Sequence, residues 1–329
     1  MDLVSVIESY IPNFGEILGV PKFLINQIYF LPDYVRQAII EALYFVPLLY
    51  FLYLAIEILE HFFMWQIPFL IKCIKKVGPL FGIFISIIPE CGFQVVASTY
   101  YSRKLITRGT LMAFFVSCSD DAYPILFFNP EKTDVIIPII IIKVAVAILT
   151  WLAVDSMIIF MKKPTEEVNA VNIELNEDAC CHHKLSSLKE AEVGWGHPWN
   201  HTLNMFFFVA IALSIYYSAV NSLGSGSNVA QLLMYNTPIQ IFGCAVFGLI
   251  PSCAASVFLA IAYVKGVISF SAFLAGLITT TGVGLLSLAT HSKKNLDTLS
   301  ITFILLVVGV VVGVLSSVLP VPSIPIFSN

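Results

Sequence analysis

The sequence IIPECGFQ, residues 87–94, interrupts a long apolar part of the chain. It combines a proline, a carboxylate, a thiol and a glycine, groups that a helix exposed to lipid does not tolerate well. A second copy, LIPSCAAS at residues 249–256, has its proline and its cysteine at the same places. Two interrupted apolar segments in corresponding halves of a chain are the best indication in a sequence of a transporter's binding site.

The composition is that of an integral membrane protein. The 329 residues are 58% hydrophobic and 12% charged, whereas a soluble domain has about 25% charged residues. The backbone inside a bilayer must satisfy its own hydrogen bonds, and long Leu, Ile, Val and Phe runs favour helices over a barrel. We therefore expect an all-α polytopic membrane protein. The chain has no Walker motif, dinucleotide fingerprint or HExxH, so we expect no enzyme, no cofactor and no nucleic-acid partner.

Hydropathy divides the chain into four parts. These are an N-terminal interfacial segment (1–33), a first membrane repeat (34–163), a cytoplasmic linker (164–196) and a second membrane repeat (197–325). Crossings are expected at 34–59, 109–128, 135–161, 201–222, 266–290 and 299–319, and interrupted segments at 78–102 and 239–263. Each half of an interrupted segment is too short to span a core of about 30 Å, so we expect a re-entrant hairpin there. Counting the hairpin halves separately or together gives about 8–10 hydrophobic segments.

The two halves align without gaps around the interrupted segments. Residues 88–113 and 250–275 share seven identities in 26 positions. The identical pairs are Ile88/Ile250, Pro89/Pro251, Cys91/Cys253, Val95/Val257, Tyr101/Tyr263, Ile106/Ile268 and Ala113/Ala275. Internal duplication of this kind is a signature of transporters.

The distribution of basic residues favours hairpins over full crossings. With both interrupted segments folded back, one side of the membrane carries twelve Lys and Arg residues and the other four, whereas full crossings give ten against six. The four are Lys22, Arg36, Lys132 and Lys265; the twelve are Lys72, Lys75, Lys76, Arg103, Lys104, Arg108, Lys162, Lys163, Lys184, Lys189, Lys293 and Lys294. Since cytoplasmic loops are rich in Lys and Arg, this arrangement places the linker in the cytoplasm. Each repeat then has three crossings, and an odd number makes the two repeats inverted.

Two adjacent carboxylates, Asp120 and Asp121, lie inside an expected crossing. Ionisable residues at this depth are costly, and they commonly mark substrate or proton sites. The alternative is that one of them pairs with Lys143 or caps a local break before Pro124. Neighbouring residues on a helix point about 100° apart, so both carboxylates face one ligand only if the backbone is unwound there.

Further candidates lie at the two interruptions. Glu90 and Gln94 share one face of a helix that begins near Glu90, although Glu90 could simply cap that helix. Cys91, Cys118 and Cys253 carry thiols, which select soft ions, whereas carboxylates suit manganese or magnesium. Cysteines buried in a membrane also serve as small hydrophobic residues.

These arguments predict one substrate or ion site. Its members are Glu90, Cys91, Gln94, Ser117, Cys118, Asp120, Asp121, Cys253, Ser256 and Thr280. Asp120, Asp121 and Lys143 are the candidates for proton coupling or charge balance, and Lys143 could instead snorkel to the interface. The linker adds a weaker candidate metal site, made of Cys180, Cys181, His182 and His183, which has no C-x-x-C spacing.

The chain resembles a family of ten-helix heavy-metal and metalloid exporters related to the ArsP-type arsenical permeases. The similar motifs are IIPECGFQ followed by SCSDDAYPIL, the mirrored LIPSCAAS followed by TTTGVGLLS, and a Cys/His linker leading into HPWNHTL. The resemblance covers roughly residues 35–320. It implies an exporter of the bacterial cytoplasmic membrane, with Glu90, Cys91, Asp120 and Asp121 on motif positions. Members of the family are labelled arsenic efflux proteins or manganese transporters.

The sequence thus favours a secondary active transporter that exports a manganese, zinc or arsenical species in exchange for protons. A second hypothesis is a permease for a small organic anion, bound at half-helix N-termini with Lys143 supplying positive charge. A passive channel and a membrane enzyme are the remaining alternatives. The expected partners are the lipid bilayer, the metal or metalloid substrate and protons, and the sequence leaves a homo-oligomer open.

Overall fold

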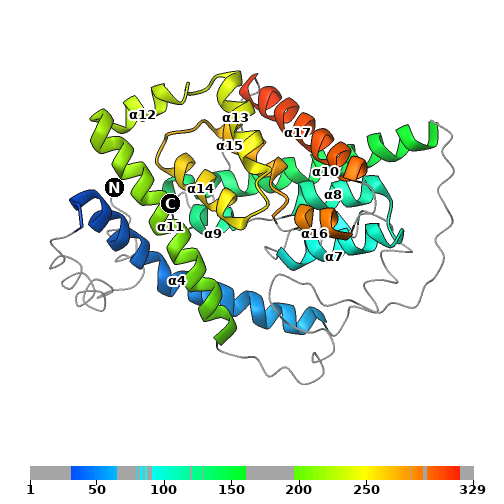
Figure 1. Ribbon diagram of the computed structural model, residues 1–329, viewed down its shortest axis with the longest axis horizontal. Coiled ribbons are helices and arrows are strands. Elements are labelled where there is room, and N and C mark those ends of the chain that lie inside the picture. Colours follow the sequence, from blue (N-terminus) through cyan, green and yellow to red (C-terminus); the bar gives the residue numbers. More distant parts are fainter. Residues whose placement is uncertain are drawn as a thin grey trace.

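The computed structural model describes residues 31–64, 80, 82–83, 86, 91–118, 121–127, 129–160, 196–282, 284–291 and 295–318. All the regular elements in these ranges are helices (Figure 1). They are α4 (Asp33–Met64), α7 (Cys91–Ser102), α8 (Arg108–Ser117), α9 (Ala122–Phe127), the 3-10 helix η1 (Pro130–Val135), α10 (Ile136–Phe160), α11 (Gly196–Leu223), α12 (Gly226–Leu232), α13 (Pro238–Gly248), α14 (Cys253–Val264), α15 (Phe270–Thr279), α16 (Gly284–His291) and α17 (Asn295–Val318). The all-helical, apolar architecture agrees with the expected polytopic membrane protein.

Several of these helices are long and apolar enough to cross a bilayer. In the described part of the chain they include Lys132–Met157, Thr202–Leu223 and Leu296–Val318. The apolar stretch Phe270–Thr290 is also long enough, but it is divided between α15 and α16. Large apolar side chains on their outer faces are exposed, such as Leu149 on α10 and Phe303 on α17, as lipid contact requires. The expected crossing at 109–128 is divided between α8 and α9. Each of these two helices is too short to cross a bilayer alone. The segment is not short of apolar residues, so the division marks a break in the helix.

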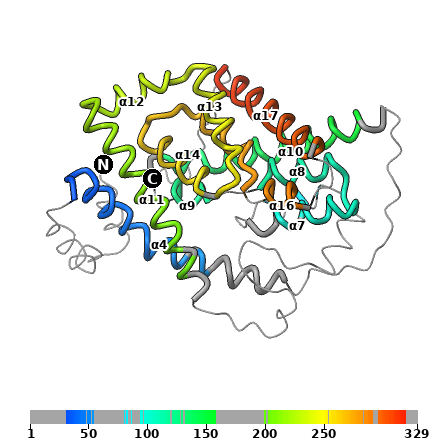
Figure 2. Tube along the Cα trace, in the orientation of Figure 1, coloured from blue at the N-terminus to red at the C-terminus, as the bar shows by residue number. Residues whose placement is uncertain are grey.

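Two long helices, α4 and α11, cross each other at one side of the molecule, as Figure 2 shows in blue and green. Helix α11 begins five residues before the expected crossing, at Gly196, because Pro198 is tolerated in the first turn of a helix. The short helix α12 leads from this pair to α13, at the edge of the remaining helices (Figure 1). Those remaining helices, α7–α10 and α13–α17, form the core.

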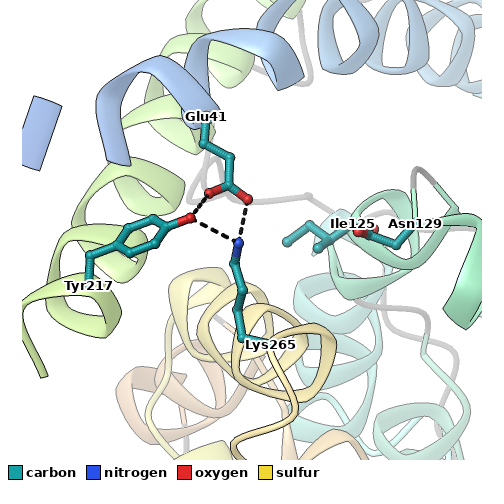
Figure 3. Close-up of polar contacts among 5 residues, drawn as sticks. All are labelled: Glu41, Ile125, Asn129, Tyr217 and Lys265. Carbon is teal, nitrogen blue, oxygen red and sulfur yellow. Dashed lines mark hydrogen bonds and ion pairs between the residues drawn. The ribbon is translucent and has the colours of Figure 1, made fainter. Parts of the chain in front are cut away.

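A polar cluster joins the α4–α11 pair to the core (Figure 3). Lys265, which caps the end of α14, donates to the Glu41 carboxylate of α4 at 2.6 Å, and the Tyr217 hydroxyl of α11 donates to the same carboxylate at 2.6 Å. The side chains of Lys265 and Glu41 are only about one fifth exposed. All three groups therefore have partners, and the cluster fixes where the end of α14 lies relative to the long pair.

The centre of the core is formed by α8 and α15, which contact each other. Every residue from Gly109 to Ser117 on α8 and from Ser271 to Thr279 on α15 is buried. Helix α15 packs between α13 and α17, and glycines permit the close approach: a Cβ on Gly248, Gly276 or Gly309 would lie closer than 3.0 Å to a neighbouring helix. Small residues are the usual means by which membrane helices pack closely.

Two pairs of helices in the two halves correspond at a spacing of 162 residues. Helix α7 (Cys91–Ser102) corresponds in both its bounds to α14 (Cys253–Val264), and α8 corresponds in the same way to α15. Their N-caps agree as well, since the Thr107 hydroxyl accepts from an amide at the start of α8 and the Ser269 hydroxyl does so at the start of α15. The five identities that lie in the described residues of both halves, Cys91/Cys253, Val95/Val257, Tyr101/Tyr263, Ile106/Ile268 and Ala113/Ala275, therefore belong to segments that form the same local structure.

Contacts between the halves follow the same correspondence. Helix α7 packs against α16, and its counterpart α14 packs against α9. The Tyr101 hydroxyl donates to Asp297 at the start of α17 at 2.6 Å, and Arg108 lies 3.6 Å from the same carboxylate. The counterpart of Tyr101, Tyr263, has Lys132 over its ring, 5.0 Å from the centroid. Each half thus contacts the other through equivalent positions.

Candidate functional site

The candidate site lies where two helices are interrupted. Helix α8 ends at Ser117, and Cys118 turns the chain away with ψ 132. Helix α15 ends at Thr279, and Thr280 does the same with ψ 113. The chain becomes helical again only in α9 and α16. These breaks occur at positions 162 residues apart, and they leave backbone polar groups without helical partners inside an apolar core.

Lys143 of α10 joins the two breaks. Its ammonium group donates to the carbonyl of Cys118 at 2.6 Å and to the carbonyl of Leu277 at 3.2 Å. Both carbonyls lie at the C-terminal end of a helix, where a helix carries partial negative charge and unpaired acceptors. The side chain is 1% exposed, which is not the arrangement of a lysine that snorkels to the interface. Lys143 therefore stabilises both breaks from within the core.

Gln94 of α7 lies against the second break. It is 2% exposed, and within the described structure its Oε1 atom has no hydrogen-bond partner. A Cβ built on Gly282 would lie 2.6 Å from that oxygen, so the glycine allows the close approach. Thr281 is fully buried, and its hydroxyl also has no partner among the described residues. These two oxygens are available to a ligand at the second break.

Other hydroxyls at the breaks bond to their own helices. Ser117 donates to the carbonyl of Ala113 at 2.7 Å, and it also contacts the hydroxyl of Ser86. Thr280 donates to the carbonyl of Gly276 at 2.8 Å. The hydroxyls of Ser117 and Thr280 thus add hydrogen bonds to carbonyls in the last turns of α8 and α15.

One carboxylate at the first break is described. Asp121 precedes α9, and the Tyr53 hydroxyl of α4 donates to its Oδ1 atom at 3.2 Å. Tyr53 is 9% exposed. This bond brings the long helix pair into contact with the first break, so that movement of α4 relative to the core would change the surroundings of Asp121.

The structure brings several predicted residues to the breaks and leaves others undescribed. Gln94, Ser117, Cys118, Asp121, Lys143 and Thr280 lie at or beside the two breaks, and Ser256, the counterpart of Gln94, is buried on α14. Cys91 and Cys253 are the first residues of α7 and α14, and the positions of their thiols are not described. The rest lie outside the described residues: Glu90, Asp120, Cys180, Cys181, His182 and His183. The described residues form no group of three or more His, Cys, Asp or Glu side chains that could hold a metal.

Sequence reasoning missed two contributors to the site. Tyr53 lies in an apolar segment rich in tyrosine and phenylalanine, where no pattern distinguishes it. Thr281 lies in the run of three threonines that corresponds to the acidic segment of the first half. That correspondence could have identified Thr281, because an equivalent place in a duplicated chain is a candidate for the same site.

The comparisons with known proteins bear on the same region. Residues 202–320 match the family described as "Putative, 10TM heavy-metal exporter". The match confirms the resemblance to the ArsP-related exporters, and it includes α12–α17 and most of α11. Residues 202–320 are thus similar to a family described as exporters, and transporters are not a class of enzymes. No curated protein and no solved structure matches the chain.

Proposed function

We propose that this protein is a secondary active transporter that exports a heavy-metal ion or a metalloid species in exchange for protons. The observation that carries the proposal is the pair of interrupted helices, α8–α9 and α15–α16, joined by Lys143 at their breaks. Interrupted helices with unwound backbone at their centre are the usual place for substrate and ion binding in transporters. The heavy-metal exporter family is the second support.

In this proposal the first half supplies the charged ligands. Asp120 and Asp121 would alternate between the substrate and a proton, and Glu90, which precedes Cys91 in the sequence, would be a third acidic ligand. Cys91 and Cys253 would supply thiols if the substrate is a soft ion. The second half contributes no acid at its own break, where threonines and glycines stand instead. The site would therefore be asymmetric, with charge on one wall and the uncharged oxygens of Gln94 and Thr281 on the other.

We also propose that the two halves are inverted repeats with re-entrant hairpins, in the cytoplasmic membrane of a bacterium. Two contacts support the hairpins. Full crossing of both interrupted segments would put Arg108 and Asp297 on opposite sides of the membrane, yet they lie 3.6 Å apart. It would also separate Lys132 from Tyr263, whose ring the lysine contacts. Hairpins place each pair on one side.

Three single-cysteine variants in a cysteine-free background distinguish the two topologies. With hairpins, Lys104→Cys and Leu296→Cys react with an impermeant maleimide from the same side, and Tyr235→Cys reacts from the other. Leu296 and Tyr235 are exposed, so a reagent can reach both positions. With full crossings, Leu296→Cys and Tyr235→Cys share a side and Lys104→Cys is alone. The second pattern would refute the inverted repeats.

Flux measurements test the function itself. Purified protein in liposomes with an imposed pH gradient should move one member of a panel consisting of manganese, zinc, arsenite and methylarsenite. We expect saturable movement against the substrate gradient, which stops when an ionophore collapses the pH gradient. Flux that only dissipates a gradient would indicate a channel. Movement of an organic acid without metal, unchanged in Cys91→Ser, would favour the organic-anion permease.

A further inference from the structure

The C-terminal ends of α8 and α15 present backbone carbonyls to one buried position in the core. The carbonyls of Cys118 and Leu277 come from different halves of the chain, and both bond to the same Lys143 ammonium at 2.6 and 3.2 Å. A helix C-terminus carries a partial negative charge. Two such ends directed at one point create an electrostatic site for a small cation.

In transporters with interrupted helices, unwound carbonyls and half-helix C-termini of this kind coordinate the coupling cation, often sodium. Here the position is filled by a side chain of the protein. Lys143 reaches it from α10, near the start of that helix, and its 1% exposure shows that the ammonium is enclosed. The corresponding helix of the second half, α17, has no basic residue.

We propose that the Lys143 ammonium is a tethered cation that occupies the position of a coupling sodium ion, so that the protein transports without sodium. The inference rests on the proposed transport function, and it deepens that proposal by stating that sodium is not the coupling ion. The ammonium group meets the two carbonyls as a bound cation would, but the covalent link prevents it from leaving. A gradient of free sodium therefore cannot drive the cycle.

The buried hydroxyl of Thr281 strengthens this interpretation. Thr281 is four residues after Leu277, beyond the end of α15 at the same break, and its oxygen has no partner among the described residues. Sodium is a hard cation that prefers oxygen ligands, as calcium and magnesium do. Removal of the ammonium would leave the carbonyl oxygens of Cys118 and Leu277 without their cation, and the Thr281 hydroxyl belongs to the second of the two breaks. Such a set of ligands is suited to sodium.

The test compares the thermal unfolding of purified protein in sodium chloride and in potassium chloride at equal ionic strength. We expect wild-type protein to show the same melting temperature in both salts. Lys143→Ala should melt at a lower temperature, and sodium should raise that temperature by about 2–4 °C at a concentration several times the Kd. Lys143→Gln is the matched control, because its amide fills the space without charge, and it should show no difference between the salts.

Stabilisation of the wild type by sodium, or equal melting of Lys143→Ala in both salts, would overturn the proposal. If Lys143→Ala cannot be purified in either salt, wild-type flux decides: a sodium gradient that drives transport contradicts the tethered cation, and indifference to sodium supports it. The melting comparison does not depend on transport. A protein that moves no metal would therefore refute the proposed function and still give a valid result here.

Discussion

Gly248→Ala should destabilise the protein more than any other single methyl group added to α13. The new Cβ would lie closer than 3.0 Å to the backbone carbonyl of Gly276 and to the hydroxyl of Thr279, both on α15. A backbone atom cannot move aside as the end of a flexible side chain can, so α13 and α15 must separate. Overpacking of this kind costs about 1–3 kcal/mol. We expect a clear fall in the melting temperature in detergent.

The matched control for this prediction is Gly243→Ala on the same helix. A Cβ on Gly243 meets nothing within 4 Å, and alanine is a better helix former than glycine by about 1 kcal/mol. Gly243→Ala should therefore melt at the same temperature as the wild type or slightly above it. Equal melting temperatures for the two variants would show that α13 and α15 are not in close contact.

Asp121→Asn should abolish most transport while leaving the fold intact. The substitution keeps the shape of the side chain and an acceptor for the Tyr53 hydroxyl, which lies 3.2 Å from Oδ1, but it removes the negative charge. Without its charge the side chain would lose a charge-assisted bond to the proposed substrate, worth about 1.5–3 kcal/mol, which corresponds to about ten- to a hundredfold in affinity. Flux of the identified substrate in liposomes measures the effect.

Two further variants interpret that result. Asp33→Asn makes the same charge change at a side chain that is 90% exposed, so flux should remain at the wild-type level. Tyr53→Phe keeps the carboxylate and removes its hydroxyl partner, so it should reduce flux by less than Asp121→Asn does. Wild-type flux in Asp121→Asn would show that Asp121 is not a ligand or a proton carrier.

The sequence predicted the break in the second half because its cause is local. Pro251 cannot continue a helix, and the chain between α13 and α14 is non-helical from Leu249 to Ser252. The corresponding break at Pro89 and Glu90 lies outside the described residues. The expected crossing at 135–161 agrees with α10, Ile136–Phe160, to within one residue at each end. A long uninterrupted apolar segment has only one way to satisfy its backbone in a bilayer.

The sequence predicted an interruption between α8 and α9 only on the condition that Asp120 and Asp121 face one ligand. Both acids could face one ligand if the backbone were unwound, and the structure shows Cys118 and Asp121 outside regular helix. The partners of Lys143 could not have been predicted in this way. The sequence left a choice between snorkelling and pairing with an aspartate. The 1% exposure of Lys143 contradicts snorkelling, and pairing with Asp120 lies outside the described residues. The bonds of the ammonium to two backbone carbonyls were not predicted, because any residue has a carbonyl.

The sequence by itself determined that this is a helical membrane protein, and it predicted two matching interrupted segments, since hydropathy and proline act on the chain locally. Tertiary structure alone decided which groups meet at the breaks. Leu277 and Lys143 are separated by 134 positions, and Tyr53 and Asp121 by 68. Contacts over such distances depend on how helices pack in the core, and packing among apolar helices is set by small residues and shape, which leave little trace in a single sequence.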